Sequence, residues 1–340
     1  MARSFAGRRV VVLGDLVADQ FVYGEISRVS REAPVLILRH ERTETVPGGA
    51  ANCAANLASL GARARVVGTV GDDAAGGALL ERLNEMGVDC GGVAILPGAQ
   101  TTTKVRLLAG HAHSTRQQVI RMDYEGATPA GADAGAQIVE HLRLACADAE
   151  AVIVSDYNYG VAGAEAVEVL RASFVGEGRP VLVDSRFRLP EFAGFTSATP
   201  NEDEVEHVAG RRLETLEALE AAGRELRERL RMKALLITRG SRGVMLVEEG
   251  AAPVHIEAVG ALEAVDVTGA GDTVIAAYAL ALASGASFAD AARLANHAGG
   301  LVVMKRGTAC VRLDELLASV SRREAEQAPA IRQDSFSKSE

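Results

Sequence analysis

The sequence has 340 residues, of which 48% are hydrophobic and 24% charged, an ordinary composition for a globular protein. This length fits one large domain or two smaller ones. The formal net charge of −9 argues against nucleic acid as the main partner, because a phosphate backbone requires a basic binding surface.

The cysteines and the N-terminus bear on location. The four cysteines form no Cys-x-x-Cys pair and match no zinc-binding spacing, which indicates reduced thiols. The first residues are polar and resemble no signal peptide, and no apolar run approaches the ~18 residues that cross a bilayer. We therefore expect a cytoplasmic protein without a membrane partner.

Strand and helix signals alternate along most of the chain. Short apolar runs predict buried parallel strands, and the Ala-rich or periodic segments between them predict helices. The alternation predicts an α/β fold with a doubly wound, mostly parallel sheet and helices on both faces. The expected strands are 9–14, 64–68, 151–155, 181–184 and 234–238, and the expected helices are 48–60, 72–86, 162–172, 214–230, 271–284 and 288–303.

Two stretches, 18–45 and 98–124, break this alternation. Apolar and polar residues alternate there without a helix between them, which predicts a small β-sheet lid at the edge of the main sheet. Such a lid exposes an apolar face that a second copy would cover, so we expect a homodimer through the lid. We expect one domain over residues 1–320 and a polar, disordered tail over 321–340.

Polar residues follow the first two expected elements. In a parallel sheet, ligands bind where the strands end. Asp15 and Asp19 follow the first strand and could accept hydrogen bonds from sugar hydroxyls, although a turn with two capping Asp residues is the alternative. Gly48, Gly49 and Asn52 open the next helix, where small residues let a ligand approach the backbone. Tight helix packing would explain the same residues.

Two later segments could serve a nucleotide and its metal. Asn201 and Glu204 share a face if a helix starts there, and such a pair can order a hydrated Mg²⁺; a capped helix start is the alternative. Residues 238–243 link two strands and could hold nucleotide phosphates, although a simple hairpin turn is favoured. His111 and His113 have strand spacing but no third ligand, so a solvated turn is favoured over a metal site.

Residues 265–273, Val-Asp-Val-Thr-Gly-Ala-Gly-Asp-Thr, form the most informative stretch. A glycine-rich turn precedes a run of helix formers, so the amides of Gly269, Ala270 and Gly271 point at whatever lies in front of the helix and make an anion site. Asp272 beside that anion fits a base that takes a proton from a hydroxyl while the amides hold the phosphoryl group under attack. An Asp that only caps the helix is the alternative.

Two familiar nucleotide motifs are missing from the sequence. There is no Gly-x-x-x-x-Gly-Lys-Ser/Thr, and the first strand ends in Gly-Asp instead of Gly-x-Gly-x-x-Gly. These absences argue against a P-loop ATPase and against a dinucleotide-dependent dehydrogenase.

The motifs at 48–52, 201–204 and 266–272 together resemble those of the ribokinase-like (PfkB) sugar kinases, over about residues 8–320. The resemblance implies a ribokinase-like fold and ATP- and Mg²⁺-dependent phosphorylation of a sugar. The segments similar to the branch that phosphorylates D-glycero-β-D-manno-heptose 7-phosphate at O1, for the ADP-heptose precursor of lipopolysaccharide, are 14–15, 27–35, 103–106, 117–123 and 296–308. In bifunctional members a nucleotidyltransferase domain follows, and only the kinase half is implied here.

The resemblance also assigns roles to single residues. It implies Asp272 as the base, with Gly269, Ala270 and Gly271 as the anion hole. Further implied contacts are Mg²⁺ through water at Asn201 and Glu204, K⁺ at Asp266 and Thr268, ATP phosphates at Thr238, Gly240 and Gly243, adenine near Asn296, sugar hydroxyls at Asp15, Gly48, Gly49 and Asn52, and the substrate's own phosphate at Lys104 and Arg106.

Three positions depart from that branch near the expected sugar pocket. Arg31 stands where a Pro is expected, Tyr159 stands near an expected Lys, and Asp184-Ser185-Arg186 replaces Asp-Pro-Lys. Arg186 keeps a positive charge and could hold a phosphate by a bidentate contact. The alternatives are another sugar or nucleoside kinase of the same family and a non-catalytic sugar- or nucleotide-binding regulator on the same fold.

Overall fold

The computed structural model describes residues 2–110, 116–126, 132–174, 176–260 and 264–327, which form two β-sheets and a set of helices. The strands of the large sheet are β1 (Arg9–Gly14), β4 (Arg63–Gly71), β5 (Asp89–Leu96), β8 (Ala151–Asp156), β9 (Val181–Ser185), β10 (Ser197–Ala198), β11 (Ala234–Thr238), β12 (Val244–Glu248) and β13 (Val254–Ile256). Their order is β13-β12-β11-β10-β9-β8-β1-β4-β5. Neighbours from β11 to β5 pair in parallel, and β12 and β13 pair antiparallel at one edge, which confirms the predicted sheet.

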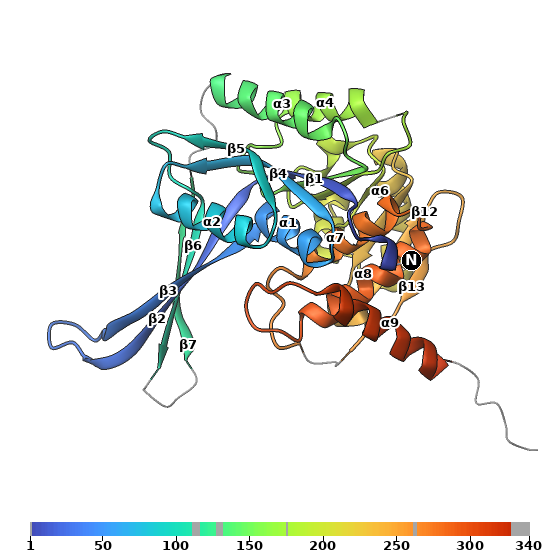
Figure 1. The fold of residues 1–340 in the computed structure, drawn as a ribbon. Coiled ribbons are helices and arrows are strands. Elements are labelled where there is room, and N and C mark those ends of the chain that lie inside the picture. Colours follow the sequence, from blue (N-terminus) through green and yellow to red (C-terminus); the bar gives the residue numbers. More distant parts are fainter. Residues whose placement is uncertain (1, 111–115, 127–131, 175, 261–263, 328–340) are drawn as a thin grey trace, which may run out of the picture.

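Helices cover both faces of this sheet (Figure 1), because its strands send alternate apolar residues to opposite sides. In β1, Val10 and Val12 join one apolar core, and Val11 and Leu13 join the other. In the described residues the helices are α1 (Ala50–Ser59), α2 (Ala74–Glu85), α3 (Ala132–Cys146), α4 (Ala164–Phe174), α5 (Glu202–Ala209), α6 (Leu216–Leu230), α7 (Ala270–Ala283), α8 (Phe288–Val302) and α9 (Leu313–Gln327), with short 3₁₀ turns at Ala2–Ser4, Leu189–Phe192 and Gly240–Arg242. Among the described helices, none is long and apolar enough to cross a membrane.

The helix α7 lies in the middle of one core. All of its residues from Asp272 to Ala281 are buried, as expected for a helix that is apolar on every side. Its neighbour α1 is built mainly of alanine, and these small side chains let the two helices approach closely. Polar groups buried between the two helices must therefore bond to one another.

The second sheet is the predicted lid. It consists of β2 (Leu16–Val29), β3 (Leu36–Gly49), β6 (Thr103–Gly110) and β7 (Gln117–Tyr124), in the order β3-β2-β6-β7. Its hairpins project away from the body (Figure 1). Because β2 begins two residues after β1 ends, the base of the lid adjoins the carboxyl ends of the parallel strands.

The two faces of the lid differ in character. Ile120 and Met122 of β7 pair with Leu107 and Val105 of β6, so these apolar side chains share one face. Ile120 is 47% exposed and Met122 is 42% exposed. The opposite face carries charged residues of β6 and β2, including Lys104, Arg106 and Asp19, and faces the body.

Several elements differ from the sequence expectations. The helix α3 and the strand β5 were not predicted, because glycines in both segments weaken the helical and strand patterns there. The predicted disorder from residue 321 is wrong as far as Gln327, because α9 extends to that residue. Leu313, Leu316, Leu317 and Val320 pack on the core at helical spacing. Residues 328–340, like His111 and His113, lie outside the described part of the chain.

Candidate active site

The expected base, Asp272, lies in the first turn of α7, near the carboxyl ends of β8 and β9. Gly269 starts the helix with a φ of 74°, a left-handed conformation that favours glycine. A Cβ at Gly269 would lie only 2.4 Å from Nδ2 of Asn52, so a larger residue could not pack there. Asp272 itself is 3% exposed, whereas the adjacent Gly271 is exposed. The turn thus buries the carboxylate beside an open helix N-terminus.

Both carboxylate oxygens of Asp272 accept a hydrogen bond. Nδ2 of Asn52 donates to Oδ2 at 2.8 Å, and the hydroxyl of Tyr157 donates to Oδ1 at 3.1 Å. Burial raises the pKa of Asp272 to about 6, and these two hydrogen bonds oppose the rise. Such a carboxyl is mostly ionised at neutral pH and yet more basic than an exposed one, which suits a general base.

Asn52 is held in place by a second buried asparagine. Nδ2 of Asn56 donates to Oδ1 of Asn52 at 3.1 Å, and Oγ1 of Thr273 donates to Oδ1 of Asn56 at 3.1 Å. This network joins α1 to α7 and fixes the direction in which the amide of Asn52 points. A contact of Asn52 with a sugar hydroxyl stays a prediction; in this structure its amide is bonded to Asp272 and Asn56, and the residue is 1% exposed.

The backbone amides at the start of α7 only partly match the expected anion hole. The amide of Ala270 donates to the carbonyl of Val267 at 3.2 Å, so it is not available to a ligand in this arrangement. Among the described residues, the amides of Gly271 and Asp272 have no backbone acceptor. The amide of Gly269 likewise has no backbone acceptor in the described part of the chain, so two of the three predicted donors, Gly269 and Gly271, are open and Asp272 adds a further one.

A cavity of about 200 Å³ lies beside this helix N-terminus. Its wall brings together the four residues expected at the nucleotide, Thr238, Gly240, Gly243 and Asn296, with Gly271. Most of the remaining wall is small and apolar, which suits a nucleobase. Nδ2 of Asn296 donates to the carbonyl of Glu257 at 2.7 Å, so this side chain shapes the cavity. Residues 238–243 also form the alternative hairpin connection, between antiparallel β11 and β12.

Asn201 and Glu204 form a capping box at the start of α5. The amide of Glu204 donates to Oδ1 of Asn201 at 2.8 Å, and the amide of Asn201 donates to Oε2 of Glu204 at 2.9 Å. The capped helix start is therefore present, and a role in binding Mg²⁺ stays a prediction. Among the described residues, no group of three or more His, Cys, Asp or Glu side chains is arranged to hold a metal.

Asp184, at the end of β9, lies between this capping box and the base. Its Oδ2 is 3.7 Å from the position that a Cβ on Gly271 would occupy. Burial, followed by the negative charges of Glu204 and Asp272, raises the pKa of Asp184 well above its usual value. Burial also raises the pKa of Glu204. This concentration of carboxylates favours a hydrated cation, which needs few direct protein ligands.

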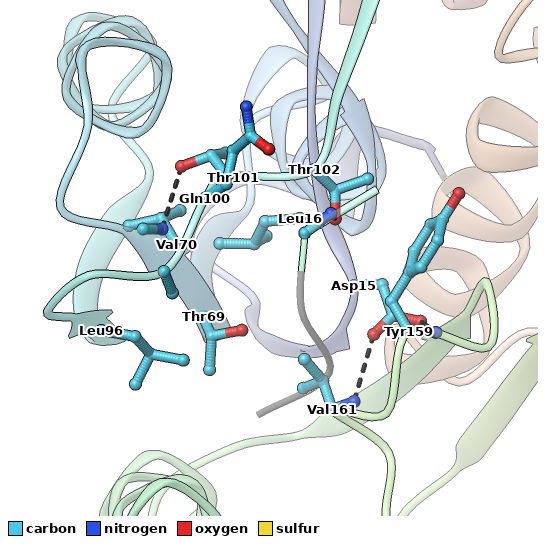
Figure 2. A pocket seen from close by; sticks show the side chains of 13 residues that line it. Asp15, Leu16, Thr69, Val70, Leu96, Gln100, Thr101, Thr102, Tyr159 and Val161 are labelled. Carbon is cyan, nitrogen blue, oxygen red and sulfur yellow. Dashed lines mark hydrogen bonds between the residues drawn. The ribbon is translucent and has the colours of Figure 1, made fainter. Parts of the chain in front are cut away.

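Asp15 anchors the loop that follows β8. Its Oδ2 accepts from the amides of Tyr157 at 2.8 Å and Tyr159 at 3.0 Å, and its Oδ1 accepts from the amide of Val161 at 3.1 Å. Figure 2 shows Asp15 with Tyr159 and Val161 at the edge of a small cavity of about 20 Å³. A contact of Asp15 with a sugar hydroxyl stays a prediction; in this structure three backbone amides donate to its carboxylate and the residue is 2% exposed.

Gly48 and Gly49 lie so close to Asp19 and Asp15 that neither position has space for a Cβ. A Cβ at Gly48 would lie 2.5 Å from Oδ2 of Asp19, and one at Gly49 would lie 2.7 Å from the carbonyl oxygen of Asp15. Arg106 in turn donates to Oδ1 of Asp19, and both side chains are almost buried. The expected contacts of Asp19 with sugar and of Arg106 with phosphate would therefore have to compete with this ion pair.

Lys104 points from the lid toward the base. Its Nζ lies 5.4 Å from the centroid of the Tyr157 ring. Burial lowers the pKa of Lys104, while the charge of Asp19 opposes this shift, and Arg121 and Arg186 lie close enough to lower it further. These three cations form a basic patch where the lid meets the body, as a phosphorylated ligand would require.

Asp266 and Thr268 border a cavity of about 900 Å³ beneath the charged face of the lid. Oδ1 of Asp266 accepts from the amide of Thr268 at 3.0 Å, and Oδ2 accepts from the amide of Gly307 at 2.9 Å. Burial opposes ionisation of Asp266, but these hydrogen bonds prevail and lower its pKa. The carboxylate thus holds two loops together, and a K⁺ site at Asp266 and Thr268 stays a prediction.

Two side chains at this site were not predicted to act there, namely Tyr157 and Asp184. Tyr157 directly follows β8, and Asp184 lies near the end of β9. The sequence marks both segments as strand ends, and Asp184 also belongs to a stretch near the expected sugar pocket, but neither side chain was assigned a role. That position was the available signal, since ligands gather at the carboxyl ends of such strands. Their contacts with α7 depend on long-range packing that no local pattern reveals.

Known proteins are similar to this chain in both sequence and fold. The profile of the pfkB family of carbohydrate kinases matches residues 8–313. The chain is 42% identical over 320 residues to the bifunctional protein HldE of Mesorhizobium japonicum, which covers 94% of the chain and 63% of that relative. It is 43% identical over 313 residues to HldE of Edwardsiella ictaluri, covering 92% and 63%. The chain thus spans less than two thirds of the length of these relatives.

Solved structures agree on the fold. Ribokinase of Arabidopsis thaliana, complexed with ribose and ATP, is 24% identical with a TM-score of 0.71, covering 92% of this chain and 99% of that one. Phosphofructokinase-2 of Escherichia coli, in complex with potassium, is 20% identical with a TM-score of 0.76, covering 94% and 99%. These likenesses confirm the ribokinase-like fold. With the family profile extending over most of its length, the chain belongs to the pfkB family of carbohydrate kinases.

Proposed function

We propose that this sugar kinase uses ATP and Mg²⁺ to phosphorylate a sugar phosphate, with D-glycero-β-D-manno-heptose 7-phosphate, phosphorylated at O1, as the preferred substrate. One observation carries the proposal. A buried carboxylate, Asp272, lies beside open amides at the start of α7, between an apolar cavity and the basic patch of the lid. A binding protein would need no such base, which argues against a non-catalytic regulator.

The geometry supports an in-line transfer. The sugar oxygen attacks the γ-phosphorus of ATP, the bond from that phosphorus to the bridging oxygen breaks, and ADP leaves. The proton of the attacking hydroxyl passes to Asp272. The amides of Gly271 and Asp272 would hold the oxygens of the transferred group, so that positioning and charge neutralisation supply most of the acceleration.

Thr238, Gly240, Gly243 and Asn296 are assigned to ATP because they line one cavity that opens at this helix N-terminus. Mg²⁺ would be held through water by Asn201 and Glu204, where the nearby Asp184 adds negative charge. When bound, the ion would neutralise charge on the phosphates. K⁺ is assigned to the neighbourhood of Asp266 and Thr268 from the resemblance alone.

The substrate's own phosphate is assigned to the basic patch. In the described residues Lys104 and Arg186 have no ion-pair partner, whereas Arg121, the third cation of the patch, is paired with Asp123, and Arg106 is paired with Asp19. A phosphate on the sugar would compensate the repulsion among these cations, which is a reason for a phosphorylated substrate over a neutral sugar. Relatives named HldE at about 40% identity support the heptose branch.

Another sugar or nucleoside kinase of the family is the second candidate. It is favoured by Arg31, Tyr159 and Ser185, which depart from the heptose branch near the expected sugar pocket. Tyr159 lies beside Asp15 in the structure, and Ser185 donates to Oδ2 of Asp156 at 2.6 Å. Arg31 lies in the turn between β2 and β3 of the lid. None of these departures changes the base, Asp272.

A substrate panel tests the proposal. The purified chain, ATP and Mg²⁺ are combined with heptose 7-phosphate, the same heptose without phosphate, fructose 6-phosphate and ribose, and ADP release is measured. The product is identified by ³¹P NMR as an anomeric phosphate. We expect the highest kcat/KM with heptose 7-phosphate and no turnover above background in Asp272→Asn. Preference for the unphosphorylated heptose or for ribose would assign the chain to the second candidate.

We also propose a homodimer formed through the apolar face of the lid. Ile120 and Met122 are among its exposed side chains, and a second copy would remove them from water. Replacing both with Glu should convert a dimer to a monomer in sedimentation velocity. A wild-type chain that sediments as a monomer at micromolar concentration would exclude this interface.

A further inference from the structure

The side chain of Tyr157 connects three parts of the molecule. It follows β8 directly, and its backbone amide donates to Oδ2 of Asp15, which fixes the loop. Its ring packs over Gly49, where an added Cβ would lie 3.4 Å from Cε2 of the tyrosine. Its hydroxyl donates to Oδ1 of Asp272. The loop, the start of α1 and the base therefore meet at this one side chain.

The lid reaches the same ring. Lys104 of β6 places its Nζ 5.4 Å from the centroid of Tyr157, a distance at which an ammonium is attracted to an aromatic face. Lys104 is paired in register with Asp19 of β2 and with Asp123 of β7. The position of Lys104 is thus set by the lid strands, and the position of Tyr157 by the body.

We infer that Tyr157 is a positioning residue that orients the carboxylate of Asp272 for proton transfer and links that orientation to the lid through Lys104. With Asn52 on Oδ2 and Tyr157 on Oδ1, the plane of the carboxylate is fixed from two different elements. A base held in one orientation keeps its remaining lone pair directed at the incoming hydroxyl. This inference rests on the proposed role of Asp272 as the base.

The hydroxyl of Tyr157 also acts on the charge of the base. Burial raises the pKa of Asp272 to about 6, and the bonds from Asn52 and Tyr157 both oppose the rise. Without the tyrosine hydroxyl, burial would raise the pKa of Asp272 further, and a larger fraction of Asp272 would be protonated at neutral pH. The other titratable groups whose charges act on Asp272 or respond to its charge are Asp19 and Lys104 of the lid, Cys53 of α1, Asp184 of β9, and Cys310.

The substitution Tyr157→Phe tests the inference, because it removes the hydroxyl and keeps the ring beneath Lys104. Tyr278→Phe is a matched control. Tyr278 lies on α7, and its buried hydroxyl is hydrogen-bonded to Ser197 and remote from the base. The carboxyl ¹³C signal of Asp272, assigned by its loss in Asp272→Asn, is titrated in the wild type and in both variants. The pH profile of kcat/KM is then recorded for the same three proteins.

We expect the titration midpoint of Asp272 to move to higher pH in Tyr157→Phe and to stay in place in Tyr278→Phe. The acid limb of kcat/KM should move with it, so that the loss relative to wild type is largest at low pH and shrinks as pH rises. An unchanged midpoint in Tyr157→Phe, or a pH profile of kcat/KM identical to that of the wild type, would overturn the inference. The ¹³C titration needs no sugar, so a wild type that fails to phosphorylate any substrate would defeat the proposed function while the midpoint still decides the role of Tyr157.

Discussion

Asp15 and Asp272 are both buried carboxylates near strand ends of one sheet, yet their surroundings differ. Three backbone amides donate to Asp15, which holds a loop in place. Two side chains donate to Asp272, which lies at a helix N-terminus where the amides of Gly271 and Asp272 have no backbone acceptor among the described residues. Burial raises the pKa of both. A shifted pKa alone therefore does not identify a base, because the donors decide whether a carboxylate supports the fold or performs chemistry.

The difference also has an origin in the sequence. The donors to Asp15 are main-chain groups, which any residue at positions 157, 159 and 161 other than proline supplies. The donors to Asp272 are the specific side chains of Asn52 and Tyr157, which only particular residues can replace. Mutations near Asp15 should therefore act mainly on stability, and those near Asp272 mainly on rate.

The largest expected effect comes from Asp272→Asn. The amide can still accept from Asn52 and donate to the Tyr157 oxygen, so the shape of the site is kept while the base is lost. We expect kcat to fall by at least ~10²-fold, as is typical when a general base is removed, with little change in the affinity for ATP measured by calorimetry. Turnover within a few-fold of wild type would show that Asp272 is not the base and would remove the contrast with Asp15.

Much of this site was predictable from sequence, and the remainder was not. The segment 265–273 marks a helix start with an acid in its first turn by local residue types alone, and the structure places Asp272 in the first turn of α7. The partners of that acid come from α1 and from the loop after β8, which are distant in sequence. Pairings of this kind depend on packing, so Asn52 was assigned to a sugar and Tyr157 was assigned no role.

The fold shows the same division. Alternating strand and helix patterns and the two polar β stretches suffice for the sheet and the lid, because these patterns are local. The strand β5 carries adjacent glycines, and its neighbours β4 and α3 hold it in place, so its sequence alone was uninformative. In α9 the apolar spacing was present, but the polar residues around it masked the helical pattern.

A second prediction separates the two carboxylates by stability. Asp15→Asn replaces an acceptor of three amides by a group with one acceptor oxygen, so an amide is left without a partner. We expect the free energy of unfolding at pH 7.5 to fall by about 1–3 kcal/mol, measured by urea denaturation. A loss below about 0.5 kcal/mol, the usual range for a neutral surface change, would mean that Asp15 does not hold its loop.

Asp272→Asn should behave in the opposite way in the same experiment. The folded-state pKa of Asp272 is raised to about 6 from an ordinary 3.8, so the folded state binds a proton more tightly than the unfolded state. Ionised Asp272 therefore lowers the free energy of unfolding above pH 6. This loss of stability disappears as the pH falls from about 6 toward 4. We expect the variant to be at least as stable as wild type at pH 7.5 and to lose this advantage near pH 4. A pH-independent difference would argue against the raised pKa.

The smallest expected effects lie in the lid, where Lys104 and Arg106 differ as the two carboxylates do. Arg106 forms an ion pair with Asp19. Lys104 contacts the ring of Tyr157 and has no ion-pair partner among the described residues, so its charge can bind a phosphate. Lys104→Met should raise KM for a sugar phosphate roughly 10-fold, the worth of one hydrogen bond to a charged group, and raise KM for the unphosphorylated sugar less. Arg106→Met should change the KM ratio of the two substrates less, because its ion pair with Asp19 leaves it less able to bind phosphate. Equal ratios in both variants would show that the lid does not distinguish a structural cation from a binding one.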